Sequence, residues 1–290
     1  MALRPEFISF ETPEGSLGAL RWQGIDGAPT VLAVHGITAN AWHFDPLAHH
    51  LAGGATIVAL DLRGRGRSHL HAGPFGIRRH AGDVADVARQ LGGQITLIGH
   101  SMGAYVALLA AEGHPRLFHG VVVVDGGTPL PAPVGIDIEA ALTHTLGPAL
   151  GRLQTTWPDR VSYQTMWSQH PAFEHGIGLD LQRTLLADLV DAPGGFRAAV
   201  NEAAVIVDGR DLLADDEIRN VLVRRRVATT IVRAPLGLDG AAPPLIADEV
   251  VASMPQHRWT TIEDTNHYTV LLDPFGAAAV ANAVRAQLAA

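Results

Sequence analysis

Runs of apolar residues recur along the chain and predict the strands of a sheet. Strands without polar alternation are buried on both faces, as in a parallel sheet covered by helices. Five runs are nearly continuous and rich in β-branched residues: Thr30–His35, Thr56–Leu62, Ile95–His100, Val121–Asp125 and Thr229–Arg233. The pattern therefore predicts a mainly parallel central sheet.

Helical patterns lie between and after these runs. Ala81–Leu91 repeats its apolar residues at helical spacing, Met102–Glu112 is an apolar helix, and Pro274–Leu288 is an Ala-rich helix near the C-terminus. Strands that alternate with helices indicate the α/β class. We expect a mainly parallel central sheet flanked by helices.

The alternation breaks after Asp125. A stretch rich in Gly and Pro, Gly126–Gly135, leads into helical patterns that run on to the strand near Thr229, far beyond an ordinary loop. We therefore expect a helical insertion at residues 127–226 in a core made of residues 1–126 and 227–290. Its aromatic residues, Trp157 and Trp167 among them, have two interpretations: the insertion's own core, or the lining of a ligand cavity.

Composition removes several kinds of chemistry. The 290 residues carry a net charge of −8 and no Cys, and all 21 basic residues are Arg. Cysteine nucleophiles, Cys-ligated metals, lysine Schiff bases and a P-loop lysine are thereby excluded. His69 and His71 have the spacing of a metal pair, yet they are better explained as a solvated loop. We expect no cofactor and no metal.

Charge and segment type bear on partners and location. An acidic chain offers no footprint for nucleic acid. The start of the chain lacks the features of a secretion signal, and no apolar run is long enough to span a bilayer. We expect a cytoplasmic protein that acts on a small molecule without membrane insertion, and a homodimer is left open.

The strongest chemical signal is Gly99-His100-Ser101-Met102-Gly103, between a predicted strand and a predicted helix. In this context G-x-S-x-G forms a sharp turn that holds a serine hydroxyl above the sheet. The helix that follows directs its first amides towards the same point, where an oxyanion would form. We expect the amides of Met102 and Ile37, the latter after the strand Thr30–His35, to form an oxyanion hole.

Four motifs together resemble the α/β-hydrolase fold superfamily across essentially the whole chain. In order they are HGIT, DLRGRGRS, GHSMG and Asn266-His267-Tyr268. The resemblance implies an α/β-hydrolase fold with the insertion as a helical cap and Ser101 as nucleophile. It also implies His267 as the general base, since His267 comes after the nucleophile and before the last helix.

Two residues compete for the acid that supports His267. The usual family position follows the strand Thr229–Arg233, but an ungapped match places Gly237 there, and Asp239 serves only if the loop is two residues longer. Asp125 ends another strand, at a position that supplies the acid in some family members. We favour Asp125 and keep Asp239 as the alternative. Either would fix the tautomer of His267 and stabilise its imidazolium.

A serine at the elbow favours acyl transfer over the alkyl-enzyme chemistry of family members with aspartate there. We expect a carboxylesterase acting on a small to medium, partly apolar ester, with His100, Trp157 and Trp167 as candidate substrate-binding residues. The same residues would serve a C–C bond hydrolase, a lactonase, a thioesterase or a cofactor-free perhydrolase. A non-catalytic ligand sensor is the alternative from another class.

Overall fold

The computed structural model describes residues 4–130, 135 and 137–290. Eight strands form one sheet in the order β1-β2-β4-β3-β5-β6-β9-β10, with β1 and β2 antiparallel and the others parallel. The strands are β1 (Glu6–Thr12), β2 (Gly15–Trp22), β3 (Thr30–Val34), β4 (Thr56–Leu60), β5 (Ile95–His100), β6 (Phe118–Val124), β9 (Ala228–Arg233) and β10 (Arg258–Thr261).

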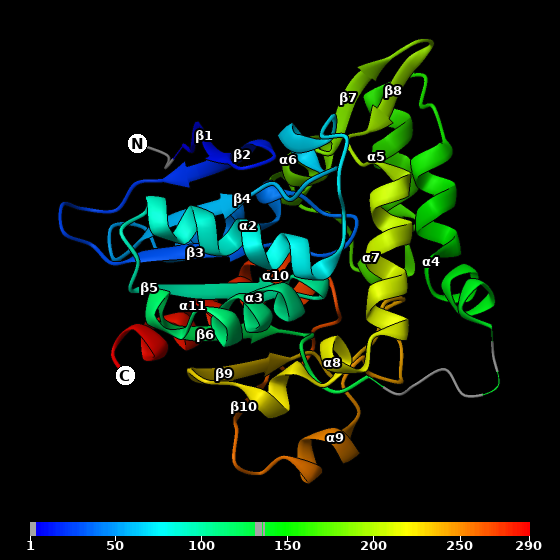
Figure 1. Cartoon of the computed structure of the whole chain (residues 1–290). Coiled ribbons are helices and arrows are strands. Elements are labelled where there is room, and N and C mark those ends of the chain that lie inside the picture. The colour runs from blue at the N-terminus through cyan, green and yellow to red at the C-terminus, as the bar shows by residue number, and fades with distance from the viewer. Residues whose placement is uncertain (1–3, 131–134, 136) are drawn as a thin grey trace.

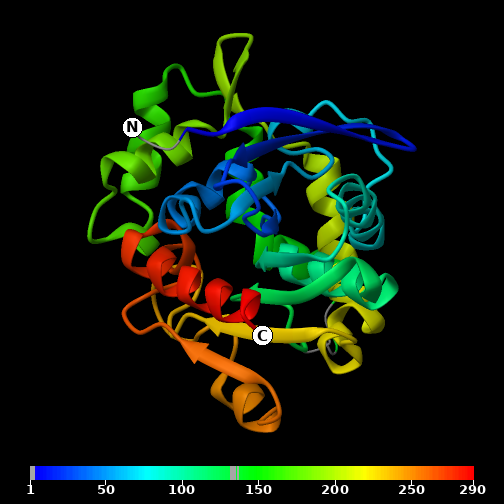
Figure 2. The same cartoon turned by 90° about the vertical axis from the view of Figure 1, so that its left-hand side faces the viewer.

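Helices cover both faces of this sheet, as Figures 1 and 2 show. On one face lie α2 (Ile77–Gln90) and α3 (Met102–Gly113), and on the other lie α1 (Asp45–His50), α10 (Thr269–Leu272) and α11 (Pro274–Leu288). A further short helix, α9 (Asp248–Ser253), lies between β9 and β10. Because successive strand residues point to opposite faces, each central strand contributes to both apolar layers. The prediction of a mainly parallel sheet flanked by helices is confirmed.

Two strands were not anticipated from the apolar pattern. β1 and β2 form an antiparallel hairpin at the edge of the sheet, and β2 pairs with β4. An edge hairpin faces solvent on one side, so its residues alternate in polarity instead of forming a continuous apolar run. The exposure of β1 follows this alternation, with Phe10 buried and its neighbours more exposed.

The segment between β6 and β9 holds five α-helices among its described residues, and Figure 1 shows α4 and α7 beside the ends of the parallel strands. The helices are α4 (Ile138–Gln154), α5 (Arg160–Ser168), α6 (Leu179–Leu186), α7 (Glu202–Ala214) and α8 (Asp216–Arg219). Residues 131–134 and 136 of the Gly- and Pro-rich stretch lie outside the described residues. The domain boundaries stay a prediction.

This insertion is not purely helical, which corrects the expectation from its sequence. A two-stranded hairpin, β7 (Leu189–Ala192) with β8 (Gly195–Ala198), interrupts the helices. Its strands of four residues are too short for an alternating pattern to stand out. The end of the insertion packs on the core, since Ile218, Val221 and Leu222 are buried in the same apolar cluster as α3. Among the described residues no helix is long and apolar enough to cross a membrane.

Candidate active site

Ser101 sits on a strained turn between β5 and α3. Its backbone has φ of 57° and ψ of −125°, a conformation that L-residues rarely adopt. The glycines on either side make this turn feasible: a Cβ on Gly99 would overlap the carbonyl of Gly103, and a Cβ on Gly103 would overlap the carbonyl of Val34 in β3. A side chain at Gly126 would likewise overlap the backbone of Ser101. The elbow is thus enclosed by three positions that exclude any side chain.

Ser101, His267 and Asp125 form a continuous hydrogen-bonded chain. The Ser101 Oγ lies 3.0 Å from Nε2 of His267, and Nδ1 of His267 lies 2.7 Å from Oδ2 of Asp125. Asp125 is fully buried and His267 nearly so. With Nδ1–H donating to the carboxylate, Nε2 is left as an acceptor facing the serine hydroxyl. The arrangement matches a nucleophile, a base and a group that orients the base.

The fold places Asp125, and not Asp239, against the histidine. Asp125 follows β6, and its backbone amide donates to the carbonyl of Val232 at 2.8 Å. Its second carboxylate oxygen accepts from the amide of Ala234 at 3.2 Å. Asp239 is exposed, and its carboxylate accepts from the amide of Ala241 instead. Since the carboxyl ends of β5 and β6 are adjacent in the sheet, Ser101 and Asp125 emerge at the same edge.

His100 supports His267 from behind. Its Nε2 donates to the backbone carbonyl of His267 at 2.9 Å, and the two rings lie 4.8 Å apart. Burial, with the charge of His267 as a second cause, holds the pKa of His100 well below its usual value, so the ring is neutral. That His100 also binds substrate stays a prediction. Gly99 and Gly103 identify the elbow in the sequence, but they do not predict that His100 contacts His267.

The loop His35–Thr38 lies next to the serine. A Cβ on Gly36 would lie only 3.2 Å from the Cβ of Ser101. His35 organises this loop: its Nδ1 donates to the carbonyl of Gly36 at 2.7 Å, and its Nε2 accepts from the amide of Leu62 at 3.1 Å. Burial lowers the pKa of His35 well below its usual value, which matches this neutral role.

Two backbone amides are candidates for an oxyanion hole beside the serine: Met102 follows Ser101 in sequence, and Ile37 lies in the neighbouring loop. Met102 is the first residue of α3, where helix amides have no partner within the helix. Ile37 follows Gly36 directly, in the loop that approaches Ser101. Both positions agree with those expected for an oxyanion hole.

An aromatic cluster of the insertion covers the residue after His267. The Tyr268 ring lies 5.6 Å from that of His267 and also contacts three rings of the insertion, Trp167, His170 and Phe173. We define the aromatic cluster as Tyr163, Trp167, His170, Phe173 and Tyr268. Trp167 is thus one ring away from His267. Trp157 is more remote, because its ring packs on Tyr163 and its backbone pairs with Phe196.

Asn266 ties the histidine loop to the insertion. Its side-chain nitrogen donates to the carbonyl of Ala172 at 2.7 Å, and its oxygen accepts from the amides of Tyr268 and Thr269. The residue therefore orders the turn that leads into α10 and holds the insertion over His267 at the same time. Its position in the Asn266-His267-Tyr268 motif is the sequence signal for this role.

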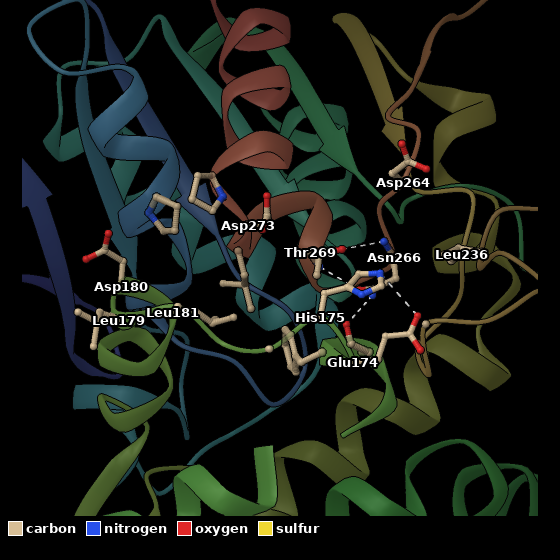
Figure 3. Close-up of a pocket in the computed structure, with 18 of the residues that line it drawn as sticks. Glu174, His175, Leu179, Asp180, Leu181, Leu236, Asp264, Asn266, Thr269 and Asp273 are labelled. Atoms are coloured by element: carbon tan, nitrogen blue, oxygen red, sulfur yellow. Dashed lines mark hydrogen bonds and ion pairs between the residues drawn. The ribbon is translucent and has the colours of Figure 1, made fainter. Parts of the chain in front are cut away.

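A pocket of about 430 Å³ lies between the insertion and the core. Figure 3 shows residues that line it. It is lined on one side by insertion residues such as His175 and Leu181, and on the other by core residues such as Asn266 and Thr269. Neither Ser101 nor His267 lines it. The pocket therefore lies beside the candidate active site, with Asn266 between the two.

A family model for the alpha/beta hydrolase family matches residues 31–282, and the chain belongs to this family. The resemblance first drawn from four motifs is confirmed by this match and by the sheet order. The chain therefore belongs to the α/β-hydrolase family by its sequence as well as by its fold.

Individual relatives are similar in sequence over different lengths of the chain. The chain is 38% identical over 98 residues to the 2-(acetamidomethylene)succinate hydrolase of Mesorhizobium japonicum. The aligned segment covers 33% of this chain and 35% of that protein. It is 28% identical over 268 residues to the lipase LipV of Mycobacterium tuberculosis. Here the aligned segment covers 89% of this chain and 93% of that lipase. The matched segment thus spans about a third of the first relative and nearly all of the second.

Solved structures show the same architecture. A crystal structure of E-2-(acetamidomethylene)succinate hydrolase superposes with a TM-score of 0.77 at 24% identity, over 98% of this chain and 100% of the other. A thioesterase domain from the curacin biosynthetic pathway superposes with a TM-score of 0.73 at 23% identity, over 97% and 99% of the two chains. At these identities the likeness shows the fold.

Proposed function

We propose that this chain hydrolyses a carboxylic ester or a related acyl bond through an acyl-enzyme on Ser101. The observation that carries the proposal is the hydrogen-bonded chain from the Ser101 hydroxyl through His267 to the buried Asp125, at 3.0 and 2.7 Å. The positive φ of Ser101 adds support, because strained backbone of this kind is found where a nucleophile must be presented.

The first half of the reaction forms the acyl-enzyme. Nε2 of His267 takes the hydroxyl proton as the Ser101 oxygen attacks the carbonyl carbon. The carbonyl oxygen gains the negative charge, which the amides of Ile37 and Met102 stabilise. Asp125 stabilises the imidazolium without taking its proton. Collapse of the tetrahedral intermediate expels the alcohol, and the alcohol oxygen receives the proton from Nε2.

The second half regenerates the serine. A water molecule gives a proton to Nε2 of His267 as its oxygen attacks the acyl carbon, and the same two amides bind the oxyanion. The Ser101 oxygen then leaves and takes the proton back. Ser101, His267 and Asp125 are already hydrogen-bonded to one another, so neither half of the reaction requires much movement of these side chains.

The test is labelling with a serine-directed fluorophosphonate, followed by turnover of p-nitrophenyl esters of increasing acyl length. Wild type should be labelled and should turn over, whereas Ser101→Ala should do neither while keeping the wild-type melting temperature. Labelling that persists in the folded Ser101→Ala chain would contradict the assignment. Labelling of Ser101 without turnover of any acyl compound would point to the ligand sensor instead.

A second candidate is cleavage of an acyl bond other than an ester. The Mesorhizobium relative is named for 2-(acetamidomethylene)succinate, a compound that contains an amide and no ester. Offering one acyl group both as a p-nitrophenyl ester and as the matching p-nitroanilide separates the two candidates. An enzyme of the second kind cleaves the anilide at a rate comparable to the ester, although the ester is intrinsically far more reactive.

A further inference from the structure

Four arginines among the described residues have nearly or fully buried side chains, and one of them differs from the other three. Arg219 forms an ion pair with Asp216. Arg63 holds Asp83 with two hydrogen bonds of 2.5 and 2.6 Å, and Arg65 lies 2.6 Å from Asp208. Arg152, in the last turn of α4, has no carboxylate so close among the described side chains. The carboxylate oxygen that approaches it, on Asp188, is 3.9 Å from its Nη1.

The Asp188 carboxylate already accepts hydrogen bonds from side chains other than Arg152. One oxygen of this carboxylate accepts from the side chain of Asn40 at 2.7 Å, and the other accepts from the Tyr163 hydroxyl at 2.8 Å. Arg152 donates to the same hydroxyl at 2.9 Å, so Tyr163 stands between the two charges. A guanidinium has five N–H donors in a fork that fits a carboxylate. Among the described residues, this one has hydrogen bonds to two neutral oxygens, the Tyr163 hydroxyl and the Thr38 carbonyl.

Arg152 lies close to the candidate active site. Its Nη2 donates to the carbonyl of Thr38 at 3.4 Å, one residue beyond Ile37. Since a residue spans at most about 3.6 Å of chain, the guanidinium lies within roughly 10 Å of the Ile37 amide. On its other side it faces the aromatic cluster, with its Cζ 5.3 Å from the ring of Trp167.

Two neutral donors accompany this charge. His170 accepts from the amide of Ala172 through Nδ1, which leaves a proton on its Nε2. Burial, with the charge of Arg152 as a second cause, lowers the pKa of His170 and keeps the ring neutral. Its ring lies 5.5 Å from that of Tyr268, which supplies a hydroxyl. A cation with neutral N–H and O–H donors beside it is a composition suited to an anion.

We propose that Arg152 binds a carboxylate of the substrate, placed a few carbons from the acyl group that Ser101 attacks, with Tyr268 and His170 as further donors. The inference rests on the proposed acyl hydrolysis and names its substrate class: small acyl compounds that carry a second, anionic carboxyl group. Such a group would give Arg152 the two-pronged contact that Arg63 already has with Asp83.

The experiment compares two esters of equal length, p-nitrophenyl pentanoate and mono-p-nitrophenyl glutarate, in which a carboxylate replaces the terminal methyl. Wild type should prefer the glutarate in kcat/KM, and Arg152→Gln should lower that preference about tenfold to a hundredfold, the worth of a charge-assisted hydrogen bond. Arg152→Lys should fall between, because an ammonium keeps the charge without the fork. Most of the change should appear in KM for the glutarate.

Arg160→Gln is the matched control, because Arg160 is an exposed arginine of the same insertion that packs over Phe196. It removes the same net charge, so a preference that falls equally in both variants would show a long-range charge effect and overturn the site. Measuring at physiological ionic strength limits that effect further.

The outcomes separate this inference from the proposed function. If Ser101-dependent hydrolysis of both esters is absent, the proposed function fails. If both are hydrolysed but wild type shows no preference, or Arg152→Gln keeps it, the carboxylate site is wrong. Should Arg152→Gln not fold, glutarate should still inhibit wild-type hydrolysis of the pentanoate competitively while glutaramide does not. Equal inhibition by the two compounds would overturn the proposal.

Discussion

Arg65 joins the insertion to the loop beside the serine: its Nη1 lies 2.6 Å from the Asp208 carboxylate of α7, and its Nε donates to the carbonyl of Ile37 at 3.0 Å. Both side chains are fully buried. His80 also contacts the Asp208 carboxylate, at 2.9 Å. The position of α7 is therefore coupled to the Ile37 backbone, whose amide we assign to the oxyanion hole.

This coupling predicts a kinetic role for Arg65 as a positioning residue. Arg65→Lys keeps a positive charge for Asp208 but removes the Nε donor to Ile37. We expect kcat to fall about fivefold with KM within about twofold, because a lost hydrogen bond of this kind is worth about 1 kcal/mol and acts in the transition state. Steady-state kinetics on a p-nitrophenyl ester measure both constants.

Arg63→Lys is the control for that experiment. Arg63 stands in the same loop and is also buried, but its side chain holds Asp83 and Glu14 and does not reach Ile37. Its variant should lose stability in urea while kcat stays within about twofold. Equal losses of kcat in the two variants would show that Arg65 acts only through folding.

The identity of the acid makes a sharper prediction. Asp125→Asn should lower kcat by about four orders of magnitude, because an amide there favours the wrong tautomer of His267. Asp239→Asn should leave kcat within about twofold, since Asp239 is exposed and its carboxylate caps the amide of Ala241. Both variants are measured with the same ester. A large loss in Asp239→Asn would refute the assignment that the geometry favours.

We expect a Gly→Ala substitution to have opposite effects on stability at Gly103, in the elbow, and at Gly82, in α2. Gly103→Ala forces a Cβ against the carbonyl of Val34, whereas Gly82, inside α2, has open space around its Cβ position. Gly103→Ala should destabilise the fold by several kcal/mol or leave it unfolded. Gly82→Ala should raise the stability by about 0.5–1 kcal/mol, through the lower entropy of the unfolded chain. Urea unfolding of both variants decides it, and comparable effects would contradict the packing.

Much of this fold is written in local patterns. The buried strand Ile95–His100 was predicted with the bounds it has, and so was the helix Pro274–Leu288. Both are specified by long runs of one periodicity. The β1–β2 and β7–β8 hairpins lack such runs, because edge strands and four-residue strands are stabilised by their partners more than by their own composition.

Some residues of the site could likewise be predicted from the sequence, and others could not. Ser101 and His267 stand in motifs whose spacing reflects a steric requirement, so the sequence shows them. That Asp125 and not Asp239 lies against His267 depends on which strand lies next to β5, and only the assembled sheet shows that order. Arg152 could not be found from sequence, since its significance is the absence of a close carboxylate among the described side chains, a property of three-dimensional packing.

Asp61 predicts how stability changes with pH. It follows β4, is almost completely buried, and accepts from the amides of Ala41 and Arg67 at 2.8 and 3.0 Å. Burial raises its pKa from 3.8 to about 6, even though these amides act in the opposite direction. The folded state therefore holds the proton of Asp61 over a range in which the unfolded chain has already lost it.

The sign follows from that difference. Below pH 3.8 the carboxyl is protonated in both states, and as the pH rises towards 6 the unfolded chain ionises first, which favours unfolding. Asp61 thus lowers the stability progressively between about pH 4 and 6, by on the order of 3 kcal/mol in total. Asp61→Asn has no such titration. Its free energy of unfolding minus that of wild type should rise across this window and level off above pH 7.

Urea unfolding of both chains at a series of pH values measures this difference, and subtracting one chain from the other cancels the groups they share. The variant loses one amide contact, because a carboxamide offers a single acceptor oxygen where the carboxylate offers two. That loss shifts the whole curve down without changing its slope. A difference that stays constant from pH 4.5 to 7, or that falls, would show that Asp61 is ionised in the folded protein throughout and that its amide contacts outweigh its burial.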